Sequence, residues 1–107
     1  MASIWEKLKN CDEFEWDEGN SYKNWQKHKV TKRDAEQVFF NIPLIIAFDE
    51  KHSEVENRFL ALGRTHGKKL LTLIFTIRKG SKVRIISARS MSKKERWAYE
   101  KKAEKDT

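Results

Sequence analysis

The sequence predicts an α+β domain in which N-terminal helices pack on an antiparallel β-meander of about four strands, followed by a C-terminal helix. Three observations predict it. Apolar residues follow a helical period up to Pro43, the only proline, and a period of two from there to Arg89; a capping pattern at Ser92 then opens a basic helix. Helices and strands kept in separate parts of a chain are typical of α+β folds, and 107 residues suffice for one domain.

The first elements are short. Ser3 and Glu6 have the spacing of a capping box and predict a helix up to about Asn10. Residues 14–16 alternate in polarity and predict a short edge strand. We divide the chain into an N-terminal extension, residues 1–13, and a single domain, residues 14–107.

Two longer helices are predicted before the proline. Asp17 has the position of an N-cap for a helix that runs to about His28. Thr31 and Asp34 form a second capping pattern, and Pro43 ends the helix that follows. The apolar residues of that helix predict one buried face, made by Ala35, Val38, Phe39 and Ile42.

The second half of the chain is predicted to form four strands and one helix. Strands are predicted at 44–48, 57–66, 71–78 and 82–89, with a polar loop at 49–56 and tight turns at 67–68 and 79–81. The third strand is the clearest, since one face is fully apolar: Leu71, Leu73, Phe75 and Ile77. In the final helix we expect Trp97 and Ala98 to form the buried stripe and Tyr99 to reach solvent.

Charge is distributed unevenly along the chain. The formal net charge is +7, yet residues 1–21 hold six acids against two lysines. Residues 76–105 hold eleven lysines and arginines against three glutamates. A basic surface of this kind indicates an anionic polymer as partner, although a solvated charged face is the simpler alternative.

The cysteine and histidine positions and the hydropathy of the chain bear on disulfides, metal sites and membrane segments. The single cysteine, Cys11, leaves no intrachain disulfide and fits a reducing compartment. Cys11 and the three histidines lack the short spacings of zinc sites, so we expect no metal and no cofactor. Without an apolar run of membrane-spanning length or a signal-peptide pattern, we expect a cytoplasmic protein with no membrane partner.

Arginines on the predicted strands are the main candidates for chemistry, because a guanidinium fork binds phosphate well. Side chains alternate between faces along a strand, so these arginines are not all expected to point the same way. Arg64, Arg78 and Arg89 are the predicted catalytic phosphate cluster, and Arg58 and Arg84 are predicted to bind RNA. The alternative is that each arginine only pairs with a glutamate.

Residues of the helix predicted up to about His28 and of the C-terminal helix complete the predicted site. His28 is predicted as a catalytic acid or base, and Lys23 and Lys27 beside it as RNA contacts. A surface histidine at a helix end is the alternative. Tyr99 is predicted to stack on RNA bases, whereas Trp25 and Trp97 at helical spacing are more typical of core or interface residues.

No nucleophile motif, phosphate-binding glycine loop or spaced carboxylate pair is present. Any enzymatic activity must therefore rest on electrostatic stabilisation and proton transfer, without a covalent intermediate. A non-catalytic module that binds RNA or DNA, and an interaction protein whose basic face meets an acidic partner, remain the alternatives.

Six separated blocks, in this order, resemble the BrnT toxins over about residues 14–100. They are Phe14-Glu15-Trp16-Asp17, Asn24-x-x-Lys27-His28-x-Val30, Asp34-Ala35-x-x-Val38-Phe39, Arg58-Phe59-x-Ala61-Leu62-Gly63, Arg84-Ile85-Ile86-Ser87-Ala88-Arg89 and Lys93-x-Glu95-Arg96-x-x-Tyr99-Glu100. The chain departs from the family at Lys29, where glycine is usual, and in residues 1–13, which the family generally lacks.

The resemblance implies a RelE-like fold and a ribonuclease toxin of a bacterial type II toxin–antitoxin module. It implies cleavage without metal, in which the ribose 2′-hydroxyl attacks the adjacent phosphate and basic residues stabilise the charge there. It also implies translation inhibition by RNA cleavage, neutralisation by a BrnA-like antitoxin of the ribbon-helix-helix type, and contact with operator DNA only through the toxin–antitoxin complex.

Overall fold

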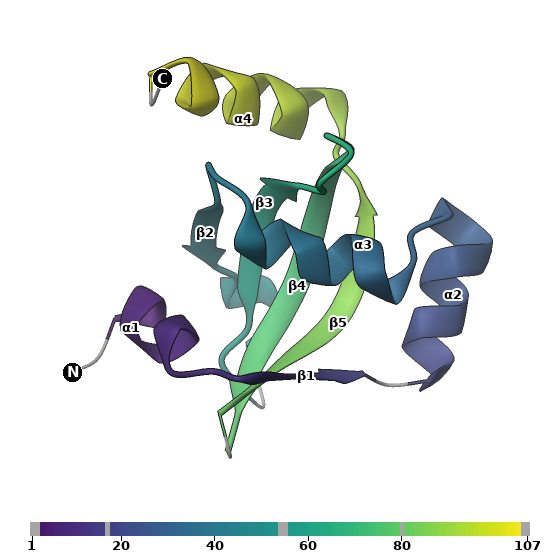
Figure 1. Ribbon diagram of the computed structural model, residues 1–107, viewed down its shortest axis with the longest axis vertical. Coiled ribbons are helices and arrows are strands. Elements are labelled where there is room, and N and C mark those ends of the chain that lie inside the picture. The colour runs from purple at the N-terminus through teal and green to yellow at the C-terminus, as the bar shows by residue number, and fades with distance from the viewer. Residues whose placement is uncertain (1–2, 17, 54–55, 80, 106–107) are drawn as a thin grey trace.

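The computed structural model describes residues 3–16, 18–53, 56–79 and 81–105 (Figure 1). The predicted cap Asp17 and the turn glycine Gly80 lie outside these ranges. The elements, in chain order, are α1 (Ile4–Lys9), β1 (Glu13–Trp16), α2 (Glu18–His28), α3 (Lys32–Gln37), the 3-10 turn η1 (Val38–Phe40), β2 (Ile45–Phe48), the 3-10 turn η2 (Glu50–His52), β3 (Phe59–Arg64), β4 (Leu70–Arg78), β5 (Lys82–Ser90) and α4 (Lys93–Lys105).

The sheet confirms the predicted α+β class. Its strand order is β1-β5-β4-β3-β2, in which β2 to β5 form the predicted antiparallel meander. The predicted edge strand is β1, which pairs in parallel with β5 and makes the sheet mixed and five-stranded. No helix in the described part of the chain is long and apolar enough to cross a membrane.

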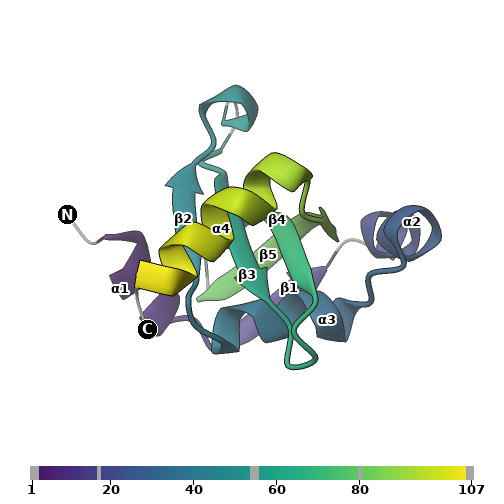
Figure 2. The same ribbon diagram turned by 90° about the horizontal axis from the view of Figure 1, so that it is seen from above.

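One face of the sheet, here the core face, carries the apolar side chains of β4 and faces α3 and η1. Leu71, Leu73 and Phe75 are fully buried there against Ala35 and Val38. Figure 2 shows α3 and α4 on opposite sides of the sheet. The apolar side of α1 also packs on this core, through Ile4 and Leu8. Apolar residues recur every second position in β4 and every three to four positions in α3. The two apolar faces that these patterns predict are in contact in the structure.

The third helix ends earlier than predicted. It continues only to Gln37 and then tightens into η1, and Asn41 donates its side-chain amide to the carbonyl oxygen of Gln37. The prediction that Ile42 lies on the buried face is wrong, because its side chain is 80% exposed. The shortened helix also brings η1 very close to β3. A Cβ on Gly63 would lie 2.5 Å from Cγ1 of Val38, so this strand position has no room for a side chain.

The other face of the sheet, here the α4 face, carries the last helix at one end. Tyr99 is 2% exposed, packs with Leu62 and Met91, and donates its hydroxyl to the carbonyl oxygen of Pro43 at 2.7 Å. Trp97 is 65% exposed. The predicted orientation of α4 is therefore wrong: Tyr99 is the buried anchor, and Trp97 faces solvent. For the same reason Tyr99 is not placed to stack on RNA bases.

Lys29 follows α2 in a conformation that favours glycine. Its φ is 55°, and its backbone N–H donates to the carbonyl oxygen of Trp25 at 2.9 Å. This is the left-handed position that often ends a helix. The chain thus keeps a glycine-like turn although it has lysine, whose ammonium lies 5.2 Å from the centre of the Trp25 ring.

Candidate functional site

Five arginines lie on the α4 face of the sheet or at its margin: Arg58, Arg64, Arg78, Arg84 and Arg89. Arg84 pairs in register with Thr76 and Arg89 with Thr72, and both threonines lie on this face. Arg84 and Arg89 are five residues apart and would face opposite ways in a regular strand. A β-bulge leaves Ile86 without a register partner and returns the second arginine to the same face. The expectation that the arginines cannot all point one way is wrong.

The same face does not bring the predicted catalytic cluster together. Arg89 pairs in register with Thr72, whereas Arg78 is six residues further along β4, a separation of about 20 Å along the strand. Arg64 pairs with Leu70 and lies at the Arg89 end. One phosphate therefore cannot contact Arg64, Arg78 and Arg89 at the same time.

Arg89 has a structural partner. Its two terminal nitrogens bond the two oxygens of Glu95 at 2.7 and 2.9 Å, and the same carboxylate accepts from the Thr72 hydroxyl and the Ser92 N–H. The Arg89 hydrogen bonds are the main cause that lowers the pKa of Glu95 to about 2, with the Ser92 and Thr72 bonds adding to it. This bidentate pair fastens the first turn of α4 to the sheet.

Arg64 lies near the other side of α4. Among the described residues no carboxylate pairs with it, and it lines a groove together with Pro43 and Lys102. Burial raises the pKa of Tyr99, and the positive charge of Arg64 acts in the opposite direction.

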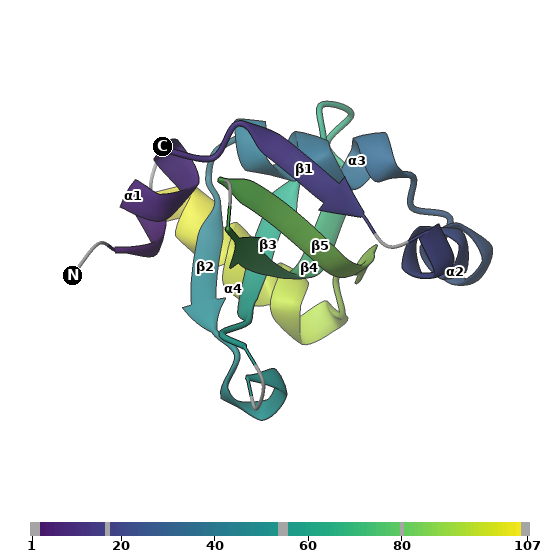
Figure 3. The same ribbon diagram turned by 90° about the horizontal axis from the view of Figure 1, so that it is seen from below.

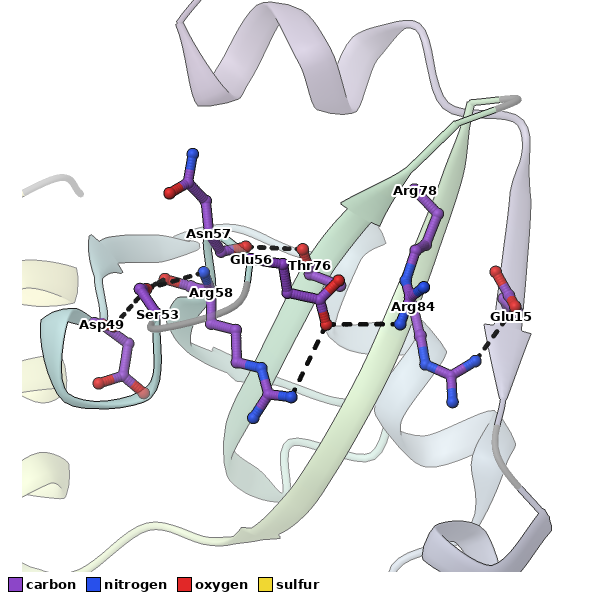
Figure 4. A network of polar contacts seen from close by, with 9 residues as sticks. All are labelled: Glu15, Asp49, Ser53, Glu56, Asn57, Arg58, Thr76, Arg78 and Arg84. Carbon is purple, nitrogen blue, oxygen red and sulfur yellow. Dashed lines mark hydrogen bonds and ion pairs between the residues drawn. The ribbon is translucent and has the colours of Figure 1, made fainter.

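The opposite end of the face holds a compact group, which we call the arginine triad: Arg58, Arg78 and Arg84 (Figure 4). One oxygen of Glu56 lies 3.4 Å from the Arg78 guanidinium and 3.7 Å from that of Arg58. Arg84 bonds Glu15 on β1 at 3.1 Å. Arg58 directly precedes β3, Arg78 ends β4, and Arg84 lies near the start of β5. In register, Arg84 pairs with Thr76, and Arg78 lies two residues further along β4.

The loop before β3 positions Glu56 and Arg58. The Ser53 hydroxyl donates to the Asp49 carbonyl oxygen at 2.6 Å and accepts from the Arg58 N–H at 3.0 Å. On the next strand, the buried Thr76 hydroxyl donates to the Asn57 carbonyl oxygen at 2.6 Å (Figure 4). These bonds tie both ends of the segment that carries the carboxylate to the sheet.

Arg58 has unused bonding capacity. Its Nε is buried and has no hydrogen-bond partner among the described residues, which is uncommon for a buried polar atom. The Glu56 contacts to Arg58 and Arg78 are long and use one oxygen, unlike the bidentate pair at Arg89. A guanidinium has five N–H donors, so the triad retains donors for an anion.

Residues of α2 do not join the triad. Lys23, Lys27 and His28 are exposed, and the two lysines line a shallow hollow on α2 with Gln26 and Lys29. No hydrogen bond joins the His28 ring to another described residue. In the described part of the chain, no three His, Cys, Asp or Glu side chains are grouped as metal ligands would be.

Sequence reasoning missed Glu56 as a member of the site. The available signal was its spacing: two residues before Arg58, an extended chain places both side chains on the same face. In the sequence the loop at 49–56 is only polar. The role of the Glu56 carboxylate becomes visible through its hydrogen bond with Arg78, which is 22 residues away.

Comparisons with known proteins identify the family. A profile described as the ribonuclease toxin BrnT of type II toxin–antitoxin systems matches residues 16–95. The chain belongs to the BrnT family. No curated protein sequence matches it. The 1.1 Å crystal structure of the Brucella abortus ribonuclease toxin BrnT is similar, with a TM-score of 0.57 and 22% identity over 77% of this chain and 100% of that one.

The BrnT profile spans the triad and Glu56 but not α1 or Glu15. The chain is thus a BrnT-family ribonuclease toxin of a type II system, a class that has RNA as target and an antitoxin as partner. The structural likeness supports the fold.

Proposed function

We propose that this chain is a metal-independent endoribonuclease whose arginine triad binds the scissile phosphate and whose Glu56 is the general base. The observation that carries the proposal is the position of one Glu56 oxygen between the guanidinium groups of Arg58 and Arg78, with Arg84 on the adjoining strand. A carboxylate oxygen held by two guanidiniums marks a place where a phosphate oxygen is stabilised equally well.

The reaction needs only a proton acceptor and positive charge. Glu56 takes the proton of the ribose 2′-hydroxyl, the O2′–P bond forms, and the P–O5′ bond breaks. The departing 5′ oxygen takes a proton from solvent, and the products end in a 2′,3′-cyclic phosphate and a 5′-hydroxyl. The triad stabilises the extra charge that develops on the phosphate oxygens, which is where fixed donors contribute most.

The rest of the basic surface serves to hold the RNA. We assign Lys23 and Lys27 on α2 to contacts with the RNA backbone beyond the cleaved bond, while the exposed His28 stands outside the reaction described above. Arg64 and Arg89 also stand outside it, because they lie at the other end of the sheet.

Family membership supports the biological setting that we propose. The toxin inhibits translation by cutting RNA in the cytoplasm, a BrnA-like antitoxin neutralises it, and operator DNA is contacted only by the joint complex. We also keep residues 14–107 as the toxin domain and residues 1–13 as an added segment.

A cleavage assay with EDTA present tests the proposal. We expect the wild type to cut a defined RNA and R78A and R84A to lose about 10²–10³-fold in rate, as when a preorganised donor is removed. R96A is the matched control, since Arg96 is an exposed arginine on α4. Equal cleavage by wild type, R78A and R84A contradicts the proposed site. Salt-sensitive RNA binding without cleavage identifies the chain instead as a non-catalytic, degenerate toxin.

A further inference from the structure

An apolar surface lies between α1, η1 and the start of β2. Its exposed members are Trp5 on α1, Phe40 in η1 and Ile42, of which Phe40 is 71% exposed. Two adjoining grooves of about 440 and 390 Å³ share Trp5 and Leu44 as lining residues and make this one continuous surface. Three exposed large apolar side chains beside two adjoining grooves make this surface a candidate docking site.

The backbone around Ile42 is held firmly. The Asn41 amide donates to the carbonyl oxygens of Gln37 and Arg64, at 3.1 and 3.0 Å, so it bridges η1 and the end of β3. On the other side, the carbonyl oxygen of Pro43 accepts from the Tyr99 hydroxyl. Ile42 is thus presented to solvent by a fixed segment, and a preorganised apolar side chain binds a partner with little ordering cost.

The second groove, which we call the Ile42 groove, has a basic rim. Its described lining contains Arg64 and Lys102 but no carboxylate. It is bounded by α1, by the start of the edge strand β2 and by the end of α4, and Figure 3 shows α1 beside β2 in this region. An occupant must therefore combine apolar side chains with acidic groups.

We infer that the Ile42 groove is the anchoring site for an acidic, amphipathic segment of the antitoxin. The inference rests on the proposed function, which supplies the antitoxin as partner. RNA fits the groove less well than an apolar segment does, because Ile42, Pro43 and Ile45 offer aliphatic contacts and Trp5 is the one aromatic side chain in the described lining. A second copy of this chain fits poorly as well, because a two-fold contact would bring the Arg64 and Lys102 rims of two +7 chains together.

The groove is separate from the reaction site. Arg64 ends β3 and Arg58 precedes its first residue, six residues away, which is about 20 Å along the strand. The segment bound at Ile42 therefore holds the antitoxin on the toxin without replacing the scissile phosphate. Binding and cleavage can consequently be changed independently.

The test uses the full chain and the antitoxin encoded by the neighbouring reading frame, with affinity measured by calorimetry and cleavage in the presence of EDTA. I42D is expected to weaken antitoxin binding by about 30-fold or more, as for a central apolar anchor, and to leave RNA cleavage at the wild-type rate. R64E is expected to weaken binding by about 10-fold or more through charge reversal. W97D, which changes an exposed aromatic residue on α4, is the matched control and should bind as the wild type does.

Each alternative outcome has a distinct meaning. Wild-type antitoxin affinity in both I42D and R64E overturns the inference, even if the chain cuts RNA as proposed. A wild-type homodimer that I42D converts to a monomer also overturns it, because the groove then joins two copies. If wild type and I42D both fail to cut RNA while only I42D loses antitoxin binding, the docking inference holds and the proposed nuclease function fails.

Discussion

The pair formed by Arg89 and Glu95 gives a prediction that separates a structural arginine from a catalytic one. The change is E95Q, which keeps an acceptor for the Thr72 hydroxyl and the Ser92 N–H but removes the charge opposite Arg89. If the pair holds α4 on the sheet, the variant unfolds more easily near pH 7. RNA cleavage by the folded variant stays at the wild-type rate.

The magnitude follows from the carboxylate's pKa, which falls from an ordinary 4.5 to about 2 in the folded chain. At about 1.4 kcal/mol per unit, the full effect is about 3 kcal/mol. The Arg89 side chain is 42% exposed, so solvent screening reduces the expected loss to about 1–2 kcal/mol. Because the folded pKa is depressed, this stability is present above about pH 5 and is lost as the pH falls through 4.5 toward 2.

Urea unfolding followed by tryptophan fluorescence measures the difference. We expect wild type to exceed E95Q by about 1–2 kcal/mol near pH 7 and the gap to shrink by about a third to a half at pH 3.5. E100Q, a change of an exposed glutamate on the same helix, is the control and should match the wild type. A gap below about 0.3 kcal/mol, or one that is equal at both pH values, refutes the reasoning.

Two further predictions concern the backbone. K29G should stabilise the chain by about 0.5–1 kcal/mol, because glycine adopts the positive φ of 55° without steric cost; a denaturation midpoint at or below that of the wild type contradicts this. G63A should destabilise by about 1–3 kcal/mol, since the new methyl meets Val38 Cγ1 at 2.5 Å; V38A should recover part of the loss when combined with it, and purely additive effects argue against a direct clash.

Local signals predicted much of the fold. The capping boxes at Thr31 and Ser92 form both expected bonds, and at Ser3 the hydroxyl accepts from the Glu6 N–H. The period of two placed β4 with the correct face buried. These features depend on residues close in the sequence or on a strong alternation. The end of α3 and the exposure of Ile42 were missed because the Asn41 bonds reach across to β3, which no local pattern reports.

The orientation of α4 was missed for a related reason. Its inward side consists of Glu95, Tyr99 and Ala103, and only Tyr99 is large and apolar. An ion pair replaces much of the hydrophobic stripe on which helical periodicity depends. Trp97 looked like the better core residue, yet it faces solvent beside Lys101.

The proposed site shares only part of its membership with the predicted one. Arg78 belongs to both the predicted cluster and the arginine triad, whereas Arg64 and Arg89 lie at the other end of the sheet. The bulge at Ile86 determines which face of the sheet Arg84 and Arg89 share, and the Glu56 carboxylate links Arg58 with Arg78. Both depend on pairing between strands, so a single sequence carries no direct signal of either.

Single-turnover RNA cleavage by E56Q with EDTA present, together with the RNA affinity of this variant, tests the catalytic role of Glu56. We expect a rate about 10²–10⁴-fold below wild type, since the proton acceptor is gone. We also expect RNA binding at least as tight, because removing a carboxylate from beside Arg58 and Arg78 leaves both free to hold phosphate. Cleavage by E56Q at the wild-type rate contradicts the claim that this carboxylate and its guanidinium neighbours form the catalytic centre.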